Sequence, residues 1–148
     1  MHRHELNAEN DRSRRDLAAF TASLSQADLA TDIGGGWTVA MALGHTAFWD
    51  LHVASQWRRR GNRLTPETWA DQAADFVNDG LEPLLAALPA AEAIRLVLAA
   101  AAEVDAVVAD LPDASLDAVR AEDRGWLVDG WEHRAEHIAQ ANRGLGRA

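Results

Sequence analysis

Apolar residues recur at helical spacing along this chain of 148 residues, and no stretch alternates between apolar and polar with a period of two. Ile94, Leu98, Ala101 and Val108 show the spacing in one alanine-rich segment. Side chains three, four and seven positions apart share one face of an α-helix, whereas alternation marks a strand. The pattern therefore predicts an all-α fold without a sheet. The length suits one domain, residues 1–148, that can bury a core.

Capping residues, glycines and prolines divide this pattern into separate helices. Thr38 is a good N-terminal cap. Gly80 and Pro83 predict a kink, or a short separate helix over 81–88. The expected helices run from about Asn7 or Asn10 to Gln26, from Thr38 to Arg60, from Pro66 to the break at Gly80, from Pro89 to Leu111 and from Glu122 to Asn142, with a short segment over 115–120.

The charge and the composition exclude several classes of partner and site. The net charge is -9 at pH 7, so the surface repels nucleic acid and anionic membranes. The N-terminal residues are polar and no uncharged apolar run could span a bilayer, so we expect a cytoplasmic location. The chain has no cysteine, which excludes a thiolate metal site. Any reacting thiol must therefore come from outside the chain.

Two of the six histidines, His133 and His137, lie four residues apart in the last expected helix. This spacing puts both imidazoles on one helix face, about 6 Å apart at Cβ, where one metal ion can bridge them. Trp126 and Gly130 are expected on the same stripe. A glycine inside a helix costs about 1 kcal/mol relative to alanine. That cost is easier to explain if something bulky must fit beside Gly130.

His45 lies in the middle of the second expected helix, on the same face as Trp49. Alone, such a histidine is more often a core residue than a metal ligand. If the second and last helices are neighbours, His45 completes a three-histidine site with open coordination positions, which is the pattern of a reactive site. His52 lies about 10 Å further along the axis. It either lines a pocket or is a partly buried polar residue.

Other residues are candidates for supporting roles around these histidines. Asp129 lies one turn before His133 and could orient that ring through its free N–H. Asp50 is a further candidate, although most such acids are expected to face solvent. Trp49 and Trp126 are expected to wall an apolar pocket that binds a small uncharged molecule.

Two segments resemble the DinB/YfiT-like superfamily. Residues 36–50, GWTVAMALGHTAFWD, resemble the start of the family's second helix, where a tryptophan and a hydroxyl cap precede a metal-ligating histidine. Residues 132–140, EHRAEHIAQ, resemble its closing His-x-x-x-His helix. The resemblance covers most of the chain and implies an up-down-down-up four-helix bundle. It also implies a zinc or nickel ion held by His45, His133 and His137.

Three kinds of function are compatible with this site, and the resemblance favours the first. The first is an enzyme in which the metal activates a low-molecular-weight thiol that attacks a small electrophile, as in bacillithiol transferases and mycothiol-dependent maleylpyruvate isomerases. The segment Gly36-Trp37-Thr38-Val39 also resembles the N-terminal domains of those isomerases. The second is metal-dependent hydrolysis by a bound water. The third is a bundle that binds metal or ligand without catalysis.

A homodimer is expected on two grounds. The superfamily that the chain resembles forms homodimers frequently. The chain also has more bulky apolar residues than one bundle core needs, among them Trp57, Trp69 and Trp131.

Overall fold

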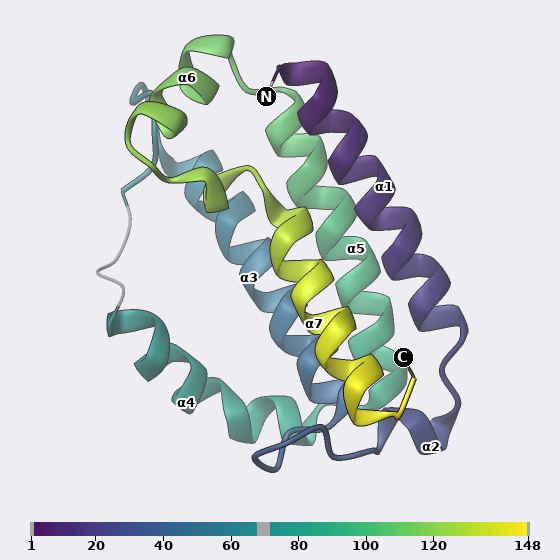
Figure 1. Ribbon diagram of the computed structural model, residues 1–148. Helices are drawn as coiled ribbons and strands as arrows, with labels where there is room; N and C mark the ends of the chain where they lie inside the picture. The colour runs from purple at the N-terminus through teal and green to yellow at the C-terminus, as the bar shows by residue number, and fades with distance from the viewer. Residues whose placement is uncertain (1, 68–71, 148) are drawn as a thin grey trace.

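The computed structural model describes residues 2–67 and 72–147, and within this part of the chain it consists of helices joined by turns and loops (Figure 1). The only extended pairing within it is an isolated bridge between Asp32 and Thr38. The all-α prediction is therefore confirmed. The helices are α1 (Arg3–Ala22), α2 (Gln26–Leu29), α3 (Val39–Arg59), α4 (Gln72–Ala87), α5 (Ala90–Ala109), α6 (Asp113–Ala121), the 3-10 turn η1 (Gly125–Leu127) and α7 (Gly130–Gly144).

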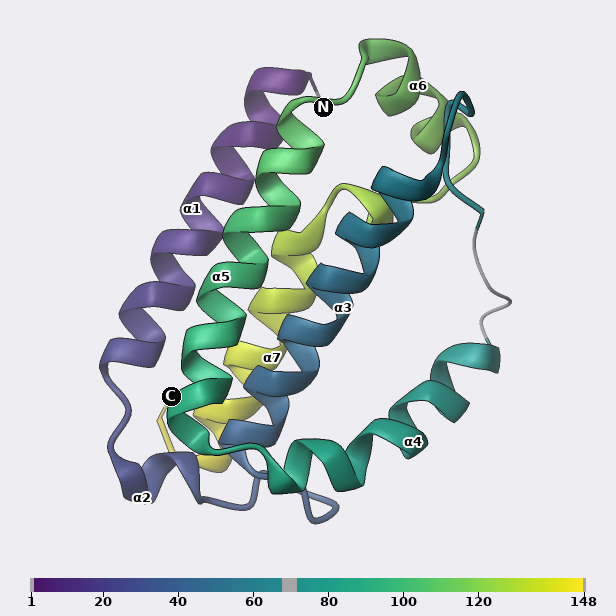
Figure 2. The same cartoon turned by 180° about the vertical axis from the view of Figure 1, so that it is seen from behind.

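Four of the helices, α1, α3, α5 and α7, pack side by side (Figures 1 and 2). α1 and α7 run in one direction, and α3 and α5 run in the other. Both α1 and α3 contact both α5 and α7, and the contact between α3 and α5 is the most extensive. α4 touches the other helices mainly through α3. None of the helices in the described ranges is long and apolar enough to cross a membrane.

The core has two apolar clusters separated by buried polar side chains. On α3, Leu43 belongs to one cluster and Trp57 to the other, and the buried Asp50 lies between them. The end of the chain passes the same layers in the reverse order. Leu127 of η1 belongs to the cluster of Trp57, the buried Arg134 of α7 follows, and Ala141 belongs to the cluster of Leu43. The apolar clusters supply the main driving force for folding. The buried polar side chains place charged groups at the level where the helices also carry the histidines.

The last helix begins later than expected, at Gly130 and not at Glu122. Two backbone carbonyl groups just before this helix accept hydrogen bonds from side chains of other helices. Trp57 Nε1 donates a hydrogen bond of 2.8 Å to the Leu127 carbonyl, and Asn10 Nδ2 donates to the Val128 carbonyl at 3.3 Å. These carbonyls would otherwise accept bonds within a longer helix. Trp126 therefore lies in η1, and its expected place on the helical stripe with His133 was wrong.

Three other expected boundaries need correction. α1 begins earlier, at Arg3, and ends at Ala22. α4 is one helix that contains both Gly80 and Pro83, so the expected separate helix over 81–88 was wrong. Both residues are exposed, so the proline ring displaces no packed neighbour and α4 loses a single backbone hydrogen bond. The expected helix start at Pro66 is not helical at that residue, and 68–71 lie outside the described residues.

A homodimer was expected partly because the chain has more bulky apolar residues than one core needs, but the described tryptophans do not all lie outside the core. Trp57 is 1% exposed and belongs to the core. Trp131 is partly buried, and Trp69 lies outside the described residues. The homodimer thus stays a prediction with less support from these side chains.

Candidate metal centre

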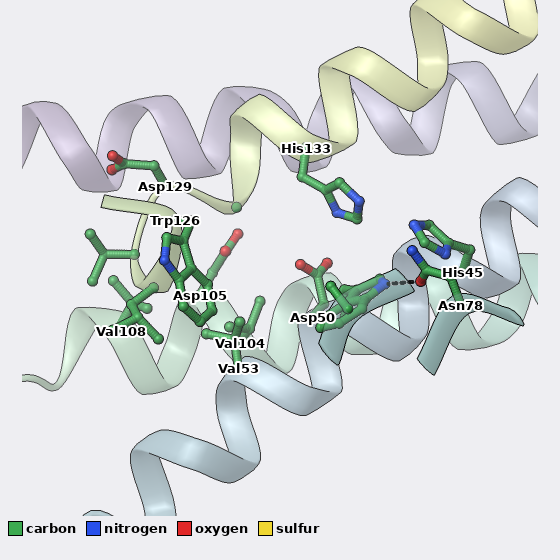
Figure 3. Close-up of a pocket in the computed structure, with 15 residues that line it drawn as sticks. His45, Asp50, Val53, Asn78, Val104, Asp105, Val108, Trp126, Asp129 and His133 are labelled. Carbon is green, nitrogen blue, oxygen red and sulfur yellow. Dashed lines mark hydrogen bonds between the residues drawn. The ribbon is translucent and has the colours of Figure 1, made fainter. Parts of the chain in front are cut away.

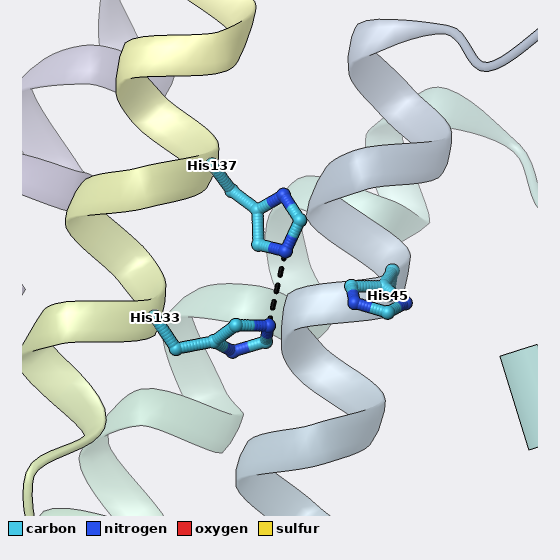
Figure 4. A group of neighbouring side chains, drawn as sticks. All are labelled: His45, His133 and His137. Atoms are coloured by element: carbon cyan, nitrogen blue, oxygen red, sulfur yellow. Dashed lines mark hydrogen bonds between the residues drawn. The ribbon is translucent and has the colours of Figure 1, made fainter. Parts of the chain in front are cut away.

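α3 and α7 bring His45, His133 and His137 together (Figure 4). One ligand nitrogen from each residue lies within 4.8 Å of those of the other two. The Nε2 atoms of His133 and His137 are 3.0 Å apart. Two nitrogens that each lie about 2.0–2.1 Å from one ion, at an angle of roughly 90–110°, would be about 2.9–3.4 Å apart. The spacing of this pair therefore fits two ligands of a single ion.

Hydrogen bonds around the cluster leave ring nitrogens available to a metal. His137 Nδ1 lies 3.1 Å from Gln140 Oε1, and because this oxygen only accepts, Nδ1 carries the hydrogen. The lone pair of His137 Nε2 is then directed toward His133. His45 Nδ1 is buried and has no hydrogen-bond partner among the described residues. An unpartnered buried nitrogen costs free energy, and a bound ion nearby can supply the missing interaction.

All three imidazoles are held in the neutral form that binds metal. Burial, with the neighbouring His137, lowers the pKa of His45 to about 4. Burial also lowers the pKa of His133 to about 3, assisted by His137, His45 and Arg134. The pKa of His137 is lowered by burial as well. A charged imidazole cannot ligate, so these shifts keep the site competent at neutral pH.

Close packing fixes the position of His45 on α3. Thr38 caps the helix by accepting a hydrogen bond of 3.2 Å from the Met41 amide. The Trp37 ring meets the His45 ring edge to face, with 5.3 Å between the ring centroids. A Cβ atom at Gly44 would lie 2.9 Å from Leu85 Cδ2. The glycine therefore allows the end of α4 to pack against α3 directly beside His45.

A cavity of about 290 Å³ extends from the histidines between α3, α4, α5 and α7 (Figure 3). His45 and His133 line it, and so do Asp50, Asp105 and Asp129. Its other walls are mainly apolar. They are formed by Trp49, Val53, Ala74, Asn78, Val104, Val108, Trp126, Leu127, Val128 and Gly130.

The residues expected at the pocket are partly in place. Trp49, Trp126, Asp129 and Gly130 all line the cavity, and Trp49 Nε1 also donates a hydrogen bond of 3.1 Å to Asn78 Oδ1 on α4. His52 is not among the lining residues. Its ring stacks on Phe48, with 5.9 Å between the ring centroids.

Asp129 does not have the contact that was expected of it. It precedes Gly130 at the start of α7, and a Cβ atom at Gly125 would lie 2.7 Å from its Oδ2 atom. Within the described ranges, no hydrogen bond joins it to His133. The interaction that orients a histidine ring comes instead from Gln140.

A buried ion-pair layer, made of Arg134, Asp50 and Asp105, lies beside the histidines and was missed from the sequence. Arg134 is 0% exposed. Its Nε donates to Asp50 Oδ2 at 2.9 Å, and its Nη1 and Nη2 donate to Asp105 at 3.1 and 2.9 Å. These bonds connect α7 to α3 and α5. Arg14 of α1 also approaches Asp105, with Nε 3.2 Å from Oδ2.

The ion-pair layer explains two features of the site. A Cβ atom at Gly130 would lie 3.1 Å from Arg134 Nη2, so the bulky group beside this glycine is the guanidinium. Burial raises the pKa of Asp50 to about 6, although Arg134 opposes the shift. The pKa of Asp105 is also raised by burial. Asp50 was a candidate for a supporting role beside the histidines, and with 4% exposure it is not one of the acids that face solvent.

Comparison with known proteins identifies one relationship. The family model of the DinB superfamily matches residues 9–141. No curated protein matches the chain. No solved structure matches it either.

Proposed function

The chain belongs to the DinB superfamily, and on this premise we propose that it is a metal-dependent enzyme that transfers a low-molecular-weight thiol to a small electrophile. The observation that carries the proposal is the convergence of His45, His133 and His137 within 4.8 Å of one another. Three neutral nitrogen ligands leave coordination positions open, as in catalytic sites. We assign the ion as zinc or nickel.

The residues around the cavity have separate proposed roles in metal binding, ring orientation and substrate contact. His45, His133 and His137 hold the ion, and Gln140 keeps the His137 ring in the orientation that ligation needs. Trp49 and Trp126 offer apolar surface to an uncharged electrophile. When bound, the ion would lower the pKa of a thiol and so favour the nucleophilic thiolate. The chain has no cysteine of its own, so the thiol is a second substrate.

The proposed architecture is a single domain with an up-down-down-up four-helix bundle made of α1, α3, α5 and α7. The directions of these helices and their mutual contacts support this topology (Figure 1). α6 supplies the short extra segment. Homodimerisation is part of the proposal, and light scattering at micromolar concentration tests it. A monomeric mass would remove it.

A conjugation assay tests the proposed activity. The protein loaded with zinc or nickel is incubated with monochlorobimane and one of bacillithiol, mycothiol, glutathione or cysteine. We expect metal-dependent conjugation with at least one thiol, and its loss in His45→Ala. His52→Ala is the matched control on the same helix, because His52 lies outside the cavity lining, and it should retain activity.

Other results of the same assay would replace the proposal. Cleavage of ester or amide substrates without any thiol would make the protein a metal-dependent hydrolase. Absence of both activities in a metal-loaded, folded protein would favour a bundle that binds metal or ligand without turnover.

A further inference from the structure

We propose that Asp50 binds the substrate, with its Oδ1 atom accepting a hydrogen bond from an O–H or N–H group of the molecule in the cavity. The inference rests on the proposed function and narrows its ligand class. The preferred ligand carries a neutral or cationic hydrogen-bond donor, and a carboxylate at that position is disfavoured.

The two oxygens of Asp50 have different surroundings. Oδ2 accepts the Nε–H of Arg134 at 2.9 Å. Among the described residues, none donates a hydrogen bond to Oδ1. The side chain is 4% exposed and lines the cavity. Figure 3 shows its carboxylate directed toward the side of the cavity where His133 lies. A carboxylate oxygen that has no donor in the protein and belongs to a cavity-lining side chain can accept a hydrogen bond from a ligand that brings a donor.

Asp105 provides the internal comparison. It also lines the cavity and also pairs with Arg134. Each of its oxygens, however, accepts from the guanidinium, Oδ1 at 2.9 Å and Oδ2 at 3.1 Å. Arg134 therefore fully engages Asp105 but only half of Asp50. This leaves Asp50 as the carboxylate with acceptor capacity for a ligand.

The charges around the cavity oppose an anionic ligand group near Asp50. The described lining residues include three carboxylates but neither arginine nor lysine. Arg134, the nearest cation, is 0% exposed and already donates to two carboxylates. Asp129 and Glu132 lie at the start of α7, where they counter the positive end of the helix dipole. Apart from the metal ion proposed at the histidines, a carboxylate brought to this part of the cavity would meet no free cationic side chain among the described residues.

The position of Asp50 relative to the histidines fits a short bifunctional ligand. Asp50 is five residues beyond His45 on α3, which is about 7.5 Å along the helix axis. A molecule with its metal-binding atom at the histidines can therefore place a donor near Asp50 through a short spacer. The apolar walls beyond Asp50, including Val53 and Val104, suit the rest of an uncharged molecule.

Binding of small thiols to the cobalt-loaded protein tests the inference. Cysteamine and 3-mercaptopropionate have the same two-carbon spacer but end in an ammonium and a carboxylate, and ethanethiol is the reference without either group. Each thiol is titrated at neutral pH while the sulfur-to-cobalt absorption band is recorded. The ratio of the dissociation constants of 3-mercaptopropionate and cysteamine is the readout. We expect this ratio to fall about tenfold in Asp50→Asn, as loss of a charged hydrogen bond implies.

Asp105→Asn is the matched control. It removes a carboxylate charge beside the same guanidinium, at a residue whose two oxygens both already accept from Arg134. The ratio should fall clearly less in this variant than in Asp50→Asn, because Asp105→Asn removes a lining charge but no hydrogen bond to the ligand. Differences in thiol acidity are the same for all proteins and cancel in the comparison. An unchanged ratio in Asp50→Asn, or an equal fall in Asp105→Asn, overturns the inference while the proposed function stands. Absence of an absorption change with every thiol overturns both. If Asp50→Asn does not fold, wild-type protein that binds 3-mercaptopropionate as tightly as cysteamine contradicts the inference.

Discussion

The histidine cluster and the ion-pair layer around Arg134 lie side by side, and both take side chains from α3 and α7. In the ion-pair layer, Arg134 donates to Asp50 and Asp105 at 2.9–3.1 Å. In the cluster, three like groups face one another, and His45 Nδ1 has no partner within the described part of the chain. Arg134 is thus satisfied by the protein, whereas the cluster is not.

Whether a buried polar group finds its hydrogen-bond partners within the protein distinguishes a structural group from a ligand-binding group more clearly than its burial does. A buried charge with complete hydrogen bonding fixes how helices meet. Three neutral imidazoles with lowered pKa values share one hydrogen-bond contact, between His133 and His137, and fit a ligand that accepts their lone pairs. Asp50 belongs to both regions, because one oxygen pairs with Arg134 and the other is free for the cavity.

The largest expected effect comes from breaking the ion-pair layer. Arg134→Met leaves the carboxylates of Asp50 and Asp105 buried without their main partner. Removing one member of a buried ion pair typically costs about 3–5 kcal/mol. We expect a loss of this size in the free energy of unfolding of the metal-free protein, measured by urea titration at pH 7.5.

The control for that loss is to neutralise Asp50 and Asp105, the two carboxylates left without Arg134. The triple variant Arg134→Met, Asp50→Asn, Asp105→Asn should recover a large part of the stability, since no uncompensated carboxylate remains. A single Arg134→Met variant as stable as the wild type would show that the ion-pair layer does not hold α7 against α3 and α5.

A smaller effect is expected from acid acting on the histidine cluster of the metal-free protein. The pKa of His45 is about 4 in the fold and 6.5 as an ordinary side chain. The unfolded chain therefore binds more protons between these values, so the stability from His45 is complete above pH 6.5 and falls as the pH drops toward 4. The slope for one such group is at most about 1.4 kcal/mol per pH unit.

Urea titrations from pH 7.5 to 4.5 measure this slope. In His45→Leu the unfolding free energy should fall less steeply with decreasing pH than in the wild type. The difference in slope is the contribution of one histidine, at most about 1.4 kcal/mol per pH unit. Asp50, whose pKa is raised to about 6, acts in the opposite direction and is common to both proteins. Equal slopes in the two proteins would mean that His45 titrates normally in the fold.

The smallest effect is expected at His52. This residue is on the same helix as His45, but its ring stacks on Phe48 outside the cavity lining. His52→Ala should therefore leave the amount of bound metal unchanged within error, as measured by elemental analysis. A clear loss of metal in this variant would extend the site beyond the three histidines.

The helical fold was predictable because apolar spacing and capping residues act locally. Thr38 and Pro89 mark the starts of α3 and α5 as expected. The start of α7 was missed because it depends on distant side chains, Trp57 and Asn10, that bond to the carbonyls of residues 127 and 128. No local signal shows that these carbonyls are already engaged.

The candidate site was predictable to the same extent. The four-residue spacing of His133 and His137 places both on one helix face, and the resemblance brought in His45. The role of Arg134 was not predictable, because all 14 basic residues are arginines and the pairing of Arg134 with Asp50 and Asp105 joins three helices. One available signal was that Asp105 shares the helical spacing of Leu98 and Ala101.

Elemental analysis of purified protein after equilibration with zinc or nickel and removal of free ion tests the central claim most directly. The wild type should carry about one ion per chain, and the double variant His133→Ala, His137→Ala should carry almost none while remaining folded by circular dichroism. Full occupancy in the double variant, or a wild type that binds neither ion, would contradict the assignment of His45, His133 and His137 as one metal site.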